Sequence, residues 1–118
     1  MGVHLHVNVC FGALYSKNEL EAAGVPLFDD NYEFQAVAVG QSNGGACGSP
    51  QPYVYLTDSK KQIAVGGGGG YCDPRSATSF DSLKNGDEKE MRSLFINFCW
   101  TKSLNFREPG WLLTWDWW

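Results

Sequence analysis

His4 and His6 are separated by one residue and are the only histidines in the sequence. Side chains two residues apart on a β-strand project to the same face, so both imidazoles could bind one metal ion such as zinc. A third ligand would have to come from elsewhere, and no spacing identifies it among Cys72, Asp73 and Asp116. Two such histidines are more often polar residues on the solvated face of an edge strand. We favour that interpretation, and the alternative is a metal-dependent hydrolase built on His4 and His6.

Five consecutive glycines, residues 66–70, follow a predicted strand and could expose backbone N–H groups to an anion. The run lacks a Gly-Lys-Ser/Thr ending and a GxGxxG spacing at the start of a helix, so it matches no phosphate-binding motif. We therefore favour a flexible connector. The alternative is a protein that sequesters a small molecule or nucleotide through these residues: Gly66, Gly68, Gly70, Tyr71, Asp73 and Arg75.

The four cysteines include no CxxC pair and are expected to be free thiols. A catalytic thiol needs a base that is itself held by a third group, and the sequence assembles no such set. Cys10 is the cysteine predicted to share a strand face with the histidines, yet a buried and inert thiol is the commoner case. We assign no catalytic residue and expect a protein that is not an enzyme.

Four of the five tryptophans lie within the last eight residues. Tryptophan and tyrosine are common anchors of protein interfaces, and exposed indole rings at a chain end favour aggregation unless something covers them. We expect some of these rings to pack in the core and the final pair to be covered by a second copy of the chain, in a homodimer. The predicted partner-binding residues are Trp111, Trp115, Trp117, Trp118 and Tyr53.

The length of 118 residues is typical of a single domain, here residues 1–118. Asp and Glu outnumber Lys and Arg by 13 to 9, giving a formal charge of −4, which disfavours binding of nucleic acid and suits a basic protein partner. No segment approaches the roughly 18 apolar residues of a membrane span, and no targeting signal is recognisable. We therefore expect a cytoplasmic protein that does not bind membranes.

Alternation of apolar and polar residues predicts a strand over residues 3–11, and apolar residues on both faces predict a buried strand over residues 33–39. Residues 41–52 are rich in Gly, Ser, Asn and Pro and are predicted to form a long loop. Residues 53–57 and 62–65 are predicted to form a hairpin around a polar turn.

Two helices are predicted from their capping residues. Ser16 and Glu19 have the spacing of a capping box before a short helix, and Asp87 can cap a longer one. An apolar stripe on the longer helix consists of Met91, Leu94, Phe95 and Phe98. A terminal strand follows Pro109 and Gly110.

These elements predict an α+β fold: a mostly antiparallel sheet of about five strands packed on one long helix and one short helix in a single pair of layers. The preferred function is a non-enzymatic binding or inhibitor module that acts through an aromatic and acidic surface. Small acidic proteins of this type are frequent among phage and mobile-element accessory proteins, some of which inhibit host defence systems.

Overall fold

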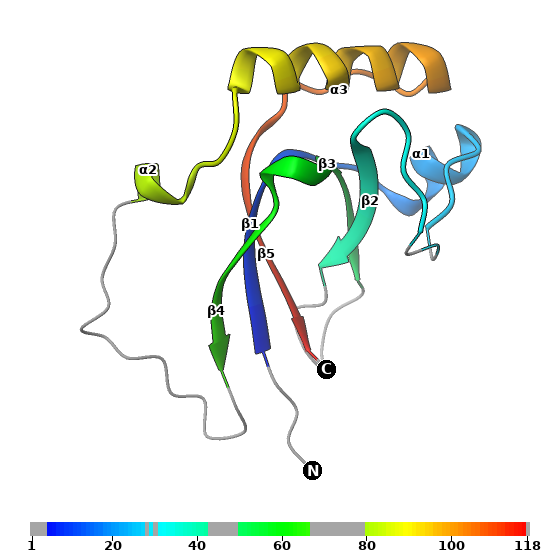
Figure 1. Ribbon diagram of the computed structural model, residues 1–118. Helices are drawn as coiled ribbons and strands as arrows, with labels where there is room; N and C mark the ends of the chain where they lie inside the picture. Colours follow the sequence, from blue (N-terminus) through cyan, green and yellow to red (C-terminus); the bar gives the residue numbers. More distant parts are fainter. Residues whose placement is uncertain (1–4, 28, 30, 43–49, 67–79, 118) are drawn as a thin grey trace.

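The computed structural model describes residues 5–27, 29, 31–42, 50–66 and 80–117. It confirms the α+β class: a five-stranded antiparallel sheet packs against the long helix α3 (Figure 1). In the described part of the chain, no helix has the length and apolar character needed to cross a membrane. The elements in chain order are β1 (Leu5–Leu14), α1 (Lys17–Ala22), β2 (Val37–Ser42), β3 (Gln51–Leu56), the 3₁₀ turn η1 (Thr57–Ser59), β4 (Lys61–Gly66), α2 (Phe80–Leu83), α3 (Glu88–Lys102) and β5 (Gly110–Trp117).

Strand β1 is the centre of the sheet and pairs with three other strands. One of its edges pairs with β5 from Leu5 to Gly12. The other edge pairs with β4 along its first half and with β3 along its second half. Strand β2 pairs with the outer edge of β3. Every pair is antiparallel.

The predicted hairpin between residues 53–57 and 62–65 is wrong. Strands β3 and β4 are both antiparallel to β1, so they run in the same direction along one edge of it. The chain between them does not reverse because η1 is pinned to β1: the buried Ser59 hydroxyl accepts the Phe11 N–H at 2.8 Å and donates to the Leu56 carbonyl at 2.6 Å. The polar residues between β3 and β4 therefore separate two strands that run in the same direction, and they do not form a reversing turn.

The predicted strand at residues 33–39 begins later than expected. Phe34 and Val37 pair with each other across Gln35 and Ala36, which have φ of 45° and 67°. Two successive residues with positive φ form a tight turn, so the strand starts only at Val37. At its other end β2 reaches Ser42, opposite Gln51, so the predicted loop at residues 41–52 is shortened at both ends.

Gly12 lies where the pairing of β1 passes from β4 to β3, and it pairs with both Tyr55 and Gly110. A Cβ atom at this position would lie 1.9 Å from the carbonyl oxygen of Val54. Only glycine lets the two backbones approach so closely. This residue therefore joins the two halves of the sheet.

Both predicted capping sites are present. Ser16 and Glu19 form the reciprocal capping box of α1, and Asp87 accepts the N–H groups of Lys89 and Glu90 at the start of α3. Helix α3 ends at Ser103, which has a left-handed φ of 56°. The predicted stripe is confirmed, because it faces the sheet: Met91, Phe95 and Phe98 are buried and Leu94 is partly buried.

The two faces of the sheet have different burial partners. The face toward α3 forms the main core with Phe95 and Phe98, and its strand residues are Phe11, Ala13, Val37, Val54 and Leu56. Side chains alternate along a strand, so the opposite face carries the intervening residues. Several of these are also buried, among them Asn8, Cys10, Tyr53 and Thr114.

Candidate functional site

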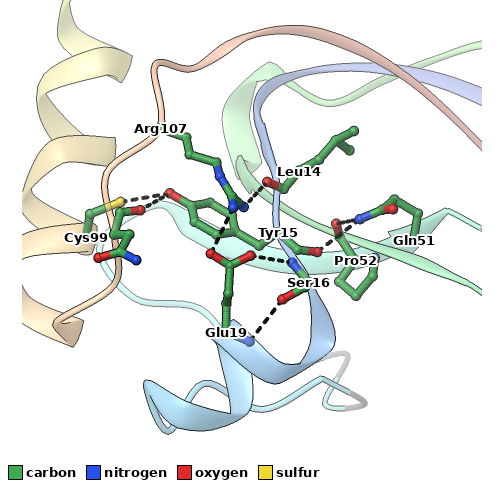
Figure 2. Close-up of polar contacts among 9 residues, drawn as sticks. Leu14, Tyr15, Ser16, Glu19, Gln51, Pro52, Cys99 and Arg107 are labelled. Atoms are coloured by element: carbon green, nitrogen blue, oxygen red, sulfur yellow. Dashed lines mark hydrogen bonds and ion pairs between the residues drawn. The ribbon is translucent and has the colours of Figure 1, made fainter.

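A polar network connects the end of β1 to helices α1 and α3 (Figure 2). The buried Tyr15 hydroxyl donates to the Asn105 carbonyl at 2.7 Å and lies 3.5 Å from the Cys99 sulfur. The Arg107 guanidinium lies 4.7 Å from the Tyr15 ring centroid, donates to the Leu14 carbonyl at 2.8 Å and pairs with Glu19 at 2.9 Å. The network joins β1, α1 and the segment after α3.

Titration of this network favours a structural role. Burial raises the pKa of the Tyr15 phenol well above its ordinary value, so the hydroxyl stays protonated at neutral pH. The pKa of Glu19 is lowered, first by the backbone N–H of Ser16 and then by the side chains of Ser16 and Arg107. A neutral phenol and a paired carboxylate are suited to holding elements together, and neither is poised for proton transfer near pH 7.

Beside this network, the C-terminal end of α3 carries exposed apolar side chains around a surface depression. The exposed fractions are 86% for Trp100, 45% for Phe106 and 38% for Ile96. We call these three residues the α3 aromatic surface. The depression has a volume of about 590 Å³ and is lined by Ile96, Cys99, Trp100, Ser103, Leu104, Asn105 and Phe106.

Helical geometry explains why these side chains point outward. The buried stripe of α3 faces the sheet, whereas Ile96 and Trp100 are four residues apart and share another face of the helix. Phe106 is fixed by an edge-to-face contact with Phe95, with 6.1 Å between ring centroids. Sequence reasoning missed Trp100, although its position outside the apolar stripe was a signal that could have identified it.

The rim of the α3 aromatic surface is polar but locally neutralised. The Arg92 guanidinium makes two hydrogen bonds to Glu108, at 2.7 and 3.0 Å, and lies 5.6 Å from the Phe106 ring centroid. The Glu108 hydrogen bond raises the pKa of Arg92, and the Arg92 hydrogen bond lowers the pKa of Glu108. An apolar centre with a polar rim is the usual arrangement at protein interfaces.

The predicted partner-binding residues do not form one surface among those described. Trp111 is partly buried, makes an edge contact with Phe11 and donates its indole N–H to Glu88 at 2.7 Å. Tyr53 is fully buried, and Trp115 is 41% exposed on β5. Only the backbone of Trp117 is described, and Trp118 lies outside the described residues.

The predicted metal site is described in part. His4 lies outside the described residues, and the Nδ1 atom of His6 is 3.3 Å from the amide oxygen of Gln62. Among described residues no group of three His, Cys, Asp or Glu side chains is placed to hold a metal ion. Zinc binding by His4 and His6 stays a prediction.

The predicted ligand loop falls almost wholly outside the described residues. Gly66 ends β4, and the remaining residues of this prediction are not described: Gly68, Gly70, Tyr71, Asp73 and Arg75. The described cysteines, Cys10 and Cys99, are free and buried. Burial raises the pKa of Cys10 to about 12, which is the opposite of what a nucleophilic thiol needs.

In comparisons with known proteins, no family model, no curated protein and no solved structure matches the chain.

Proposed function

We propose that this chain is a non-enzymatic protein-binding module that acts through the α3 aromatic surface. The observation that carries the proposal is Trp100, which is 86% exposed beside a depression with apolar walls. Tryptophan is the residue most enriched at binding hot spots, and an indole that is largely in water contributes little to the stability of the fold. A partner that covered it would remove that apolar area from water.

The placement of Trp100 supports binding to a protein. The residue lies on a fifteen-residue helix whose opposite face is anchored in the core, so its backbone is already ordered before binding. Ser103 and Asn105 line the same depression and offer hydrogen-bonding groups beside the apolar centre. The partner would insert an apolar side chain into the depression, and a small inhibitor module would act by occupying that partner's surface.

The test compares three forms of the full chain: wild type, Trp100→Ala and Leu113→Ala. Leu113 is a matched control because it is also apolar and exposed, to 50%, but lies on β5. Each form is immobilised and exposed to lysate of the producing cell, and retained proteins are quantified by mass spectrometry. We expect one protein whose retained amount falls at least about tenfold with Trp100→Ala and stays unchanged with Leu113→Ala. Truncating a hot-spot residue removes about 2 kcal/mol or more of binding free energy.

Identical retained proteins for all three forms would overturn the proposal. Native mass spectrometry of the same samples addresses the predicted homodimer. A dimer that Trp100→Ala dissociates would show that a second copy covers this surface, and it would replace the proposed partner.

A further inference from the structure

Lys60 lies between η1 and β4, on the side of the sheet that faces away from α3. Its Nζ atom donates to the Tyr53 hydroxyl at 3.0 Å. The same atom lies 4.8 Å from the ring centroid of Tyr55 and 5.5 Å from that of Tyr53. The two rings pack against each other with centroids 5.3 Å apart, so they form two walls around the ammonium group.

This ammonium has no counter-charge within the described residues. No carboxylate lies within 4.0 Å of its Nζ atom, whereas Arg92, Arg107 and Lys84 each have an acidic partner. Glu33 is the acidic residue that acts on neighbouring Tyr55, and its carboxylate accepts the Thr57 hydroxyl at 3.0 Å. Burial removes part of the hydration of this ammonium, and the oxygen atoms of an anion could replace it.

Tyr55 and Cys10, which lie near Lys60, are neutral at physiological pH and cannot supply that counter-charge. Burial raises the pKa values of Tyr55 and of the nearby Cys10, the latter to about 12. Burial opposes the ammonium form of Lys60, but interactions with Tyr53, Tyr55 and Cys10 leave its pKa above the ordinary value. The site therefore carries a full positive charge at pH 7, on a chain whose net charge is −4.

The remaining hydrogen-bonding capacity points to the kind of ligand. An ammonium group has three N–H donors, and the Tyr53 hydroxyl takes one of them. The side chain is half-buried, so solvent reaches part of it. Aromatic walls lower the local dielectric constant and strengthen attraction between the ammonium and an incoming anion. The two N–H donors that have no partner among the described residues suit the oxygen atoms of an anion, since hydrogen bonds between charged groups are strong.

We propose that Lys60, held between Tyr53 and Tyr55, is a binding site for an oxyanion group. The site is separate from the α3 aromatic surface and goes beyond the proposed protein binding. The shared chemistry is an oxygen anion, which a phosphate or a carboxylate can supply.

The proposal is tested by NMR titration of the full-length chain with sodium phosphate and, in a second arm, sodium acetate. Ionic strength is held constant with sodium chloride. We expect saturable shifts of the Lys60 side-chain signals and of the Tyr53 and Tyr55 ring signals in at least one arm. The arm with the lower dissociation constant identifies the source of the oxyanion. Linear, non-saturating shifts in both arms would overturn the proposal.

Two variants make the assignment specific. Lys60→Met removes the ammonium and keeps the aliphatic stem, and Lys61→Met is its control because Lys61 is the adjacent, exposed lysine. We expect the dissociation constant to rise at least tenfold in Lys60→Met and less than twofold in Lys61→Met. Equal binding by both variants would overturn the proposal. If Lys60→Met does not fold, the wild-type titration still decides, because it needs no substitution.

Discussion

Both faces of the sheet contain buried residues, but they differ in how well the buried polar groups are hydrogen-bonded. The face toward α3 is apolar and packs Val54 and Leu56 against Phe95 and Phe98. The opposite face buries polar groups, and the Thr114 hydroxyl among them has no hydrogen-bond partner in the described part of the chain. A buried polar group without a partner lowers stability, so the second face is not arranged for stability alone. The first face holds the fold together, and the second contains the ammonium of Lys60, which has no carboxylate partner among the described residues.

Removing a large side chain from the α3 face should have the largest effect. Phe98 is fully buried, and Phe98→Ala should lower the free energy of unfolding by about 3–5 kcal/mol through lost burial and a residual cavity. The measurement is urea unfolding followed by circular dichroism. Trp100→Ala is the control on the same helix, and its change should stay within about 0.5 kcal/mol because the ring is exposed. Similar losses for both variants would contradict the assigned orientation of α3.

The opposite face should protect its thiol from reaction. Cys10 is fully buried and its pKa is raised from 9.0 to about 12, so its thiolate fraction at pH 8 is about a thousandfold below that of an ordinary thiol. Iodoacetamide labelling of the native protein, followed by peptide mass spectrometry, should leave Cys10 unmodified until the protein is unfolded in urea. Labelling at the same rate in both states would show that this face is open.

Replacing the unpartnered hydroxyl should raise stability. Thr114→Val keeps the shape of the side chain and removes a buried oxygen with no partner, so the free energy of unfolding should increase by about 1 kcal/mol. The midpoint of urea unfolding measures this change. A matched control is Thr101→Val on the exposed side of α3, which should change stability little. A loss of stability in Thr114→Val would indicate that the hydroxyl has a partner in solution.

The smallest expected change in stability comes from a substitution in the polar network around Tyr15, Glu19 and Arg107. The pKa of Glu19 is lowered in the folded protein, so its stabilising contribution is present above the ordinary glutamate pKa of about 4.3 and is lost as pH falls below it. The thermal midpoint should therefore fall less between pH 6 and about pH 3 in Glu19→Gln than in wild type. Glu21→Gln is the control, since its partner Lys17 is 3.9 Å away and both side chains are largely exposed. Equal slopes for the two variants would contradict the stabilising role of the contacts that Glu19 makes with Ser16 and Arg107.

Local patterns determined much of the secondary structure. Alternation located β1, the residues at Ser16 and Asp87 located both helix starts, and a period of 3.6 identified which face of α3 is buried. These features depend on neighbours within a few residues, which is why the sequence contains them. The same patterns failed at η1, because a polar interruption looks alike whether the chain reverses or continues along the same strand.

The functional candidates depended on contacts that no local pattern contains. By itself the sequence determined the α+β class, the acidic charge and the wealth of aromatic residues at the end of the chain. Only the tertiary structure decided that Tyr53 is buried while Trp100 is exposed, and that Lys60 meets two tyrosines without a carboxylate partner. Burial and charge pairing are set by segments far apart in the sequence, so they become fixed only when those segments pack together.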